Sequence, residues 1–248
     1  MTYQAVLFDL FDTLVHFDRD RLPTVEINGR TVRSTVGRLH GLLRPHAPQV
    51  SLEACYDALQ GSWQEAERLR AIDHREVSAP ERFADLFRRL SVDAATCPPD
   101  FVQTLIETHR TELARAALFP PYYRDLLVRL AERFRLGVVS NFDYTPTALG
   151  ILEREAVLPL FEVVLVSDAV GWRKPRRDIF DRALAVMRLE PAQALFVGDR
   201  LDIDVAGAQA IGMDAAWVNP AGAPVPPGVG PPRFEIKDLR ELEPILGR

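Results

Sequence analysis

Residues 5–15 read Ala-Val-Leu-Phe-Asp-Leu-Phe-Asp-Thr-Leu-Val. The apolar run before Asp9 predicts a strand that is buried on both faces of a parallel sheet, with the acid at its carboxyl end. Ligands of open α/β sheets bind at the carboxyl ends of the strands. We therefore expect Asp9 to be a nucleophile or a metal ligand, and the residues around it decide between these roles.

Strands and helices alternate in the second half of the chain. The predicted strands cover residues 135–140, 162–166, 194–197 and 214–218. The predicted helices cover residues 122–133, 147–156, 178–187 and 205–211. This alternation is typical of a doubly wound parallel sheet, to which the strand before Asp9 also belongs. The Pro- and Gly-rich segment 219–233 predicts a loop, and residues 234–246 predict a last short strand and helix.

The segment between these two parts has a different pattern. Residues 25–32 alternate around Asn28-Gly29, which predicts a β-hairpin. Apolar residues then recur at helical spacing as far as about residue 118, which indicates about four helices with short loops. We therefore expect residues 1–15 and 119–248 to form an α/β core, and residues 16–118 to form an inserted helical cap with an initial hairpin.

The composition excludes several classes of protein. The chain has 248 residues, a net charge of −5 and 47% hydrophobic residues, so we expect a globular protein without a nucleic-acid partner. Residues 1–4 lack the basic flank of a signal peptide, and no apolar run reaches membrane-spanning length, so we expect neither a signal peptide nor a membrane partner. Cys55 and Cys97 lack metal-ligand spacing, which favours free thiols and a cytoplasmic location. A monomer and a homodimer are both compatible with the sequence.

Polar residues stand at or just beyond the ends of the predicted strands. They are Asp9, the pair Ser140-Asn141, Lys174, and the acids Asp199 and Asp204. Parallel strands end at the same edge of a sheet, so these residues are expected to converge on one pocket. Carboxylates that share a pocket repel one another unless a cation neutralises them, and an all-oxygen ligand set favours Mg²⁺. A lysine and a serine hydroxyl supply the charge and the hydrogen bond that a phosphoryl group needs.

Each of these residues also has a purely structural explanation. Asp9 could cap a turn, Ser140-Asn141 could form one, and Lys174 could be solvated. Asp202 and Asp204 could cap a helix that begins near residue 205, and for Asp202 we favour that explanation. Among 30 basic residues only two are lysines, which favours a specific need for a compact ammonium at position 174. The joint occurrence of these residue types at successive strand ends favours a functional site.

Four segments resemble motifs I to IV of the haloacid dehalogenase-like hydrolase superfamily, in the same order. They are Asp9-x-x-x-Thr13-Leu14, Ser140, Lys174-Pro175 and Gly198-Asp199-x-x-x-x-Asp204. The segment between motifs I and II is similar to the helical C1 cap of subfamily I. Residues 139–143 and 169–175 resemble the branch that includes haloacid dehalogenase-like hydrolase domain-containing protein 3. The resemblance therefore implies a Rossmann-like core with an inserted cap.

The same resemblance implies a role for each matched residue. Asp9 is the nucleophile, which forms an aspartyl-phosphate, and Lys174 orients it. The expected Mg²⁺ ligands are Asp9, the main-chain carbonyl of Phe11, Asp199 and Asp204. The expected contacts to the phosphoryl group come from Thr13, Ser140, the backbone N–H of Asn141, and Lys174.

Phe11 departs from the family pattern. Phosphatases of the superfamily usually carry a second Asp two residues after the nucleophile, which protonates the leaving group and then activates water. Asp12 stands one residue too late, and taking Asp12 as the nucleophile would place His16 where the motif has Thr. General acid–base catalysis contributes roughly 10²–10⁴-fold to the rate, and its loss affects poor leaving groups most. His16 could replace the missing acid, although a surface histidine is the simpler interpretation.

Three functions are compatible with this pattern. The favoured one is a Mg²⁺-dependent phosphohydrolase that acts on a small phosphorylated metabolite through Asp9. The second is a phospho-ligand-binding or interaction protein with little turnover. The third is a metal-independent 2-haloacid dehalogenase, since those enzymes carry an aromatic residue at the position of Phe11 but lack the acids of motif IV. The sequence does not identify the physiological substrate, because no motif in the expected cap can be interpreted.

Overall fold

The computed structural model describes residues 3–226 and 230–247 and divides the chain into two compact units. Unit 1 comprises Met1–Phe17 and Leu118–Arg248, and unit 2 comprises Asp18–Ala117. A short pair of strands, β2 (His16–Phe17) and β5 (Ala117–Leu118), marks the two points where the chain passes from one unit to the other.

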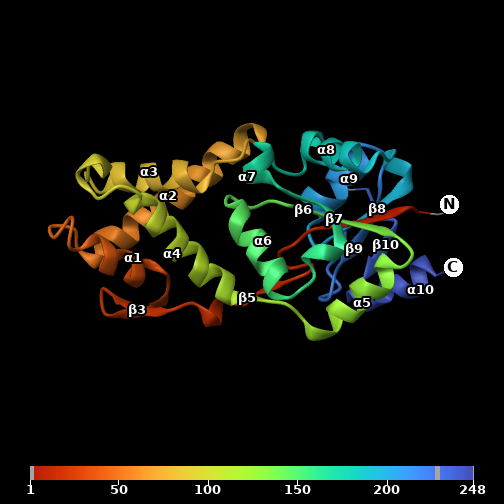
Figure 1. Cartoon of the computed structure of the whole chain (residues 1–248), viewed down its shortest axis with the longest axis horizontal. Coiled ribbons are helices and arrows are strands. Elements are labelled where there is room, and N and C mark those ends of the chain that lie inside the picture. Colours follow the sequence, from red (N-terminus) through yellow and green to blue (C-terminus); the bar gives the residue numbers. More distant parts are fainter. Residues whose placement is uncertain (1–2, 227–229, 248) are drawn as a thin grey trace. The chain divides into compact units, whose positions relative to one another are not determined.

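Unit 1 contains a six-stranded sheet with the order β10-β9-β8-β1-β6-β7 (Figure 1). All of its strand pairings are parallel. The strands are β1 (Ala5–Phe8), β6 (Arg135–Ser140), β7 (Phe161–Val166), β8 (Ala194–Gly198), β9 (Asp214–Val218) and β10 (Phe234–Ile236). β1 lies between β6 and β8, so that Phe8 is in register with Val138 on one side and Val197 on the other. The predicted doubly wound α/β class is confirmed, and the topology reverses at β1, where such sheets bind ligands.

Helices cover both faces of this sheet. Figure 1 shows α8 and α9 on one side of the strands and α5 and α10 on the other. The helices of unit 1 are α5 (Pro121–Ala131), α6 (Thr145–Arg154), α7 (Ser167–Val170), α8 (Arg177–Met187), α9 (Ala206–Ala210) and α10 (Leu242–Leu246). Short 3₁₀ turns occupy Leu158–Leu160, Pro191–Gln193 and Leu239–Glu241.

One predicted helix is different in the structure. Residues 205–211 were expected to form a regular helix, but Leu201–Val205 form a π-helical turn and only Ala206–Ala210 are α-helical. The backbone N–H groups of Asp204 and Val205 both donate to the carbonyl of Arg200, at 2.8 and 3.2 Å. The widened turn accommodates Asp204, whose side chain is buried against Gly198.

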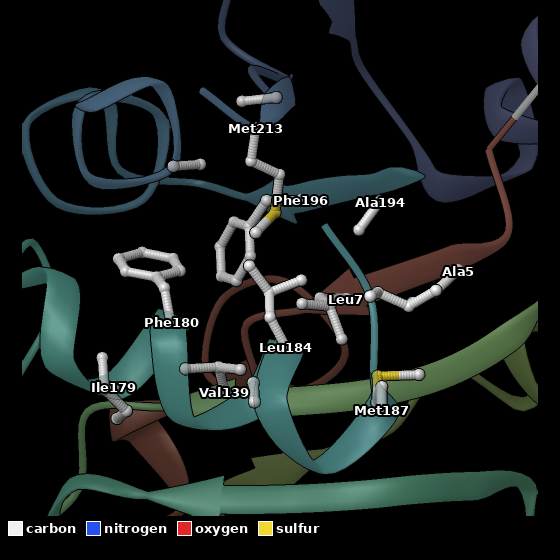
Figure 2. Close-up of a cluster of buried hydrophobic side chains, with 14 of the residues drawn as sticks. Ala5, Leu7, Val139, Ile179, Phe180, Leu184, Met187, Ala194, Phe196 and Met213 are labelled. Carbon is white, nitrogen blue, oxygen red and sulfur yellow. The ribbon is translucent and has the colours of Figure 1, made fainter. Parts of the chain in front are cut away.

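An apolar cluster fixes α8 against the sheet. Figure 2 shows Phe180 and Leu184 of α8 beside Leu7 of β1 and Phe196 of β8. The rings of Phe180 and Phe196 pack edge to face, with centroids 5.1 Å apart and an interplanar angle of 74°. Because β1 and β8 are buried on both faces, their carboxyl ends are held in fixed positions beneath the pocket described below.

Unit 2 contains the predicted hairpin and four helices. β3 (Thr24–Ile27) pairs with β4 (Arg30–Arg33), and Asn28 and Gly29 at the turn have φ angles of 49° and 73°. Positive φ at both positions is typical of a type I′ turn, which is a common connection in hairpins. The helices are α1 (Val36–Leu43), α2 (Leu52–Asp73), α3 (Ala79–Arg89) and α4 (Phe101–Ala116), with 3₁₀ turns at Arg19–Arg21 and Ala94–Thr96. A capping box of Ser78 and Glu81 begins α3.

Three further features bear on the expectations from the sequence. In the part of the chain that the structure describes, no helix has the length and apolar character required to cross a membrane. Cys55 and Cys97 are free cysteines. Of the predicted loop at 219–233, residues 219–226 and 230–233 contain no helix or strand, and residues 227–229 lie outside the described residues.

Candidate active site

A pocket in unit 1 opens where β1, β6 and β8 end. Six of the eight residues predicted for the site line it, namely Asp9, Phe11, Asn141, Lys174, Asp199 and Asp204. The other lining residues are Asp12, Arg173, Arg200 and Ile203. The sequence did not predict these four residues for the site, although each is within three residues of a motif position.

Three carboxylates meet in this pocket. Asp9, Asp199 and Asp204 each offer an oxygen, and these oxygens lie within 4.8 Å of one another. Burial raises the pKa of Asp199 to about 7, and the charges of Asp9 and Asp204 add to the increase. Burial also raises the pKa of Asp9 to about 6, although Lys174 opposes that change. The cluster therefore needs positive charge to remain ionised at neutral pH.

Lys174 supplies part of that charge. The side chain is 2% exposed, and its Nζ donates to Asp9 Oδ1 and to the carbonyl of Val139, both at 2.7 Å. Nζ also lies 2.8 Å from Asp204 Oδ1, as an ion pair without hydrogen-bond geometry. Burial tends to lower the pKa of Lys174, but Asp204 and Asp9 outweigh burial and the pKa rises. The single ammonium pairs with two of the three carboxylates, so the cluster keeps an excess of negative charge over Lys174.

The arrangement of the acids fits a hard divalent cation. The donor set is all oxygen, as Mg²⁺ prefers. A Cβ at Gly198 would lie 2.4 Å from Asp204 Oδ2, so glycine is what allows this carboxylate to lie against the end of β8. Asp204 Oδ2 accepts from the backbone N–H of Arg200 at 3.0 Å, and the Trp217 indole Nε1 donates to the Asp199 carbonyl at 2.8 Å. The backbone around two of the acids is thus held by hydrogen bonds.

Two hydroxyl groups lie buried near the ends of β1 and β6 and do not line the pocket. Thr13 and Ser140 are fully buried, and neither Thr13 Oγ1 nor Ser140 Oγ has a hydrogen-bond partner among the described residues. Leaving a buried hydroxyl without a partner costs about 1–3 kcal/mol. Groups of this kind are available to donate to an oxygen of a ligand.

Asn141 directs its side chain to the lysine loop. Its Nδ2 donates to the carbonyl of Lys174 at 3.0 Å, and its Oδ1 accepts from the backbone N–H of Lys174 at 2.8 Å. The sequence predicted a contribution only from the backbone N–H of Asn141. A side-chain bond to a loop 33 positions away has no local sequence signal.

Phe11 and Asp12 occupy the turn after β1. The ring of Phe11 lies 4.7 Å from that of Phe142, so an apolar surface stands where the family carries its second acid. Asp12 has a left-handed backbone, with φ at 58°, and its Oδ1 accepts from the backbone N–H of Phe17 at 3.1 Å.

The predicted helix cap at Asp202 is wrong. The Asp202 carboxylate accepts two hydrogen bonds from the guanidinium of Arg200, at 3.0 and 2.8 Å. This exposed ion pair joins Arg200, which precedes the π-helical turn, to a residue of that turn, and the turn begins at Leu201, before the helix predicted from residue 205. The carboxylate therefore neutralises Arg200 at the edge of the pocket.

A model of the haloacid dehalogenase-like hydrolases matches residues 3–212 of the chain. The chain belongs to this family of hydrolases. Among relatives of this hydrolase, the glyceraldehyde 3-phosphate phosphatase of Pyrococcus abyssi is 32% identical over 215 residues, which cover 86% of the chain and 80% of the relative. Haloacid dehalogenase-like hydrolase domain-containing protein 3 of Bos taurus is 39% identical over 116 residues, which cover 45% of each protein.

The solved structures include a member with a different reaction in its name. The 2-haloacid dehalogenase of Pseudomonas syringae pv. Tomato DC3000 superposes on the hydrolase with a TM-score of 0.72 at 26% identity, covering 100% of the chain and 99% of that structure. Phosphatase and dehalogenase relatives therefore both match the hydrolase over most of its length, and the residues of the site must distinguish them.

Proposed function

We propose that this hydrolase is a Mg²⁺-dependent phosphohydrolase that acts on a small phosphorylated metabolite through a phosphorylated Asp9. The observation that carries the proposal is the cluster of Asp9, Asp199 and Asp204. The negative charge of these three carboxylates exceeds the single positive charge of Lys174. A dehalogenase reaction has no need for the two additional acids. A relative named as a phosphatase at 32% identity supports the same choice.

In the proposed reaction, a carboxylate oxygen of Asp9 attacks phosphorus, and the bond from phosphorus to the leaving oxygen breaks. Lys174 holds Asp9 in position through its 2.7 Å hydrogen bond. The hydroxyl groups of Thr13 and Ser140 donate to the phosphoryl oxygens, which satisfies two buried groups. Water then attacks phosphorus, the bond to Asp9 breaks, and phosphate leaves.

Four oxygen donors would hold the metal. They are carboxylate oxygens of Asp9, Asp199 and Asp204 and the main-chain carbonyl of Phe11. Bound Mg²⁺ would supply the missing positive charge and stabilise the charge on the phosphoryl group.

Phe11 sets the expected substrate preference. Its ring has no proton to give, so the leaving oxygen must take its proton from water or depart as a stable anion. Acyl and aryl phosphates should therefore react better than alkyl phosphates. Because a relative is named for glyceraldehyde 3-phosphate, that triose phosphate is the first metabolite to test. We propose that unit 2 serves as the cap that selects the substrate, in a cytoplasmic monomer or homodimer.

The decisive experiment measures turnover of acetyl phosphate, p-nitrophenyl phosphate and glyceraldehyde 3-phosphate with Mg²⁺ and with EDTA. Asp9→Asn should lower kcat by roughly 10⁴-fold or more, since loss of a covalent nucleophile has an effect of that order. Mg²⁺ should be required by the wild type. Activity that remains in Asp9→Asn, or that persists in EDTA, would contradict the proposed mechanism.

Phe11 also supports an alternative, a metal-independent 2-haloacid dehalogenase. Halide leaves without a proton, so an aromatic residue at this position is compatible with that reaction, and a dehalogenase structure superposes at 26% identity. Release of chloride from 2-chloropropionate in EDTA, without hydrolysis of any phosphate ester, would favour this alternative. Binding of phosphate or of a metal fluoride without turnover of any substrate would instead indicate a phospho-ligand-binding protein.

Substitution of Phe11 by Asp tests the interpretation of this position. If Phe11→Asp restores an acid, hydrolysis of alkyl phosphates should gain about 10²-fold, whereas acetyl phosphate should change little. An equal change for both classes of substrate would contradict the assignment of the missing acid to this position.

A further inference from the structure

Lys174 lies in a loop, although its side chain requires accurate placement. It follows α7, which ends at Val170, and precedes α8, which begins at Arg177. The hydrogen-bond ladders of the sheet therefore do not fix its backbone. Yet its Nζ must lie within 2.8 Å of oxygens on both Asp9 and Asp204, which are on other segments of the chain.

Asn141 provides a direct connection between this loop and the sheet. It immediately follows Ser140, the last residue of β6, and β6 pairs with the strand that precedes Asp9. Its carboxamide forms two hydrogen bonds to the backbone of Lys174, one in each direction, at 3.0 and 2.8 Å. The orientation of the amide follows from chemistry, since only Nδ2 can donate to the carbonyl and only Oδ1 can accept from the N–H.

We propose that Asn141 is a positioning residue, whose side chain holds the backbone of Lys174 so that the ammonium reaches Asp9 and Asp204. The catalytic consequence rests on the proposed function, because it requires that Lys174 orients a reacting Asp9. The positional consequence does not rest on it. Among the described residues, the two bonds from the Asn141 carboxamide are the only hydrogen bonds to the Lys174 backbone. Removing the carboxamide therefore leaves that backbone without a hydrogen bond to any described residue.

The chain contains a matched control for this arrangement. Asn219, after β9, forms the same pair of bonds with the backbone of Ala223, with Nδ2 donating to the carbonyl at 2.9 Å and Oδ1 accepting from the N–H at 2.9 Å. Asn219 does not line the pocket. Replacing either asparagine by alanine removes the same two hydrogen bonds to a loop, and Asn219→Ala also removes a third bond, from Nδ2 to Glu235 Oε1 at 2.6 Å. Only Asn141→Ala affects the loop that carries Lys174.

The first readout is accessibility, which does not need an active enzyme. Only two lysines are present, and Lys174 is 2% exposed. Labelling by an amine-reactive reagent, read by mass spectrometry, can therefore compare Lys174 with Lys237 in the same molecule. We expect Asn141→Ala to increase the labelling rate of Lys174 relative to Lys237 by at least about tenfold, the size expected when one to two hydrogen bonds are lost. Asn219→Ala should leave this ratio unchanged.

The second readout is kinetic. With p-nitrophenyl phosphate and saturating Mg²⁺, Asn141→Ala should lower kcat by about 10- to 100-fold, because a misplacement of about 1 Å costs up to 10²-fold. Asn141→Asp keeps the acceptor but loses the donor, so its kcat should fall less than that of Asn141→Ala. Asn219→Ala should lose thermal stability to a similar extent and keep kcat.

The outcomes separate the proposal from the proposed function. Unchanged labelling of Lys174 in Asn141→Ala would overturn the positioning role, whatever the kinetics. Increased labelling with an unchanged kcat would confirm the positioning role and overturn the part of the mechanism that depends on Lys174. If the wild type hydrolyses no phosphate, the proposed function fails, and the labelling ratio still decides the role of Asn141.

Discussion

Each unit contains a buried cation with carboxylates around it, and the two groups differ in whether the chain itself supplies all of their ion-pair and hydrogen-bond partners. In unit 2, the guanidinium of Arg70 donates to Glu76, to Glu67 and to the carbonyl of Val77, at 2.7–3.0 Å. In unit 1, Lys174 pairs with two carboxylates of a cluster of three, and two hydroxyl groups nearby have no partner among the described residues. The first group is completed by the chain itself and serves the fold. The second group is not completed by the described residues, which is consistent with the proposed binding of Mg²⁺ and a phosphoryl group.

The strongest test of this difference removes the cation from each group. Lys174→Met and Arg70→Met should each lower the free energy of unfolding in EDTA by about 3–5 kcal/mol, because each leaves at least one buried carboxylate, Asp204 or Glu76, without its cation. Mg²⁺ should restore part of the loss in Lys174→Met, since it can take the place of the missing charge. Urea titrations with and without Mg²⁺ measure both effects. Recovery of Arg70→Met by Mg²⁺ would contradict the comparison.

The pH dependence of stability should also distinguish the two states of the pocket. The pKa of Asp199 is raised to about 7, above its unfolded value, so between about pH 4 and pH 7 the folded protein binds more protons than the unfolded chain. Stability of the metal-free protein should therefore fall as the pH rises through this range, by on the order of 3–4 kcal/mol. Calorimetry in EDTA at pH 4.5 and pH 7.5 measures the change. Addition of Mg²⁺, or the substitution Asp199→Asn, should reduce this change in stability. An equal dependence of stability on pH in the metal-free protein, the Mg²⁺-bound protein and Asp199→Asn would contradict the raised pKa of Asp199.

A smaller effect is expected from the glycine beneath Asp204. Gly198→Ala places a methyl group 2.4 Å from the buried carboxylate, and crowding of this kind costs about 1.5 kcal/mol. Mg²⁺ affinity should fall as well, because Asp204 must move. Gly150→Ala is the matched control, since nothing lies within 4 Å of the added atom. Isothermal titration with Mg²⁺ should therefore separate the two variants, and equal affinities would show that Asp204 tolerates the shift.

The smallest effect is expected from Trp217. Trp217→Phe removes the hydrogen bond from the indole to the Asp199 carbonyl, which is worth about 1 kcal/mol, and Mg²⁺ affinity should fall severalfold. Trp63→Phe, at an exposed position in unit 2, should leave the affinity unchanged. A loss of affinity in Trp63→Phe alone would reverse the expected roles of the two tryptophans.

The sequence predicted much of this molecule for identifiable reasons. Buried parallel strands are apolar throughout, so β1, β8 and β9 were located from composition, and Asn28-Gly29 marked the hairpin because few other residues adopt positive φ. The meeting of Asp9, Lys174 and Asp204 also followed, since all parallel strands end at one edge.

Other features depend on contacts that no local pattern encodes. The bond from Asn141 to the lysine loop, and that from Trp217 to Asp199, join segments that are distant in the sequence. The π-helical turn at Leu201–Val205 contains Asp204, a buried acid that lies against Gly198, and helix propensity does not predict a turn of this kind. The prediction for Asp202 was wrong because an aspartate can either cap a helix or pair with an arginine, and the sequence does not distinguish these two roles.

The place of β1 in the sheet has a consequence for synthesis of the protein on the ribosome. β1 emerges before all of unit 2, yet its two neighbours in the sheet pair with it at Arg135 and Ala194, far later in the chain. Throughout translation of unit 2, this apolar strand has both edges open, and open edges promote aggregation. Unit 2 can therefore fold before unit 1 begins to assemble, and the nascent chain should depend on chaperones until β8 has left the ribosome.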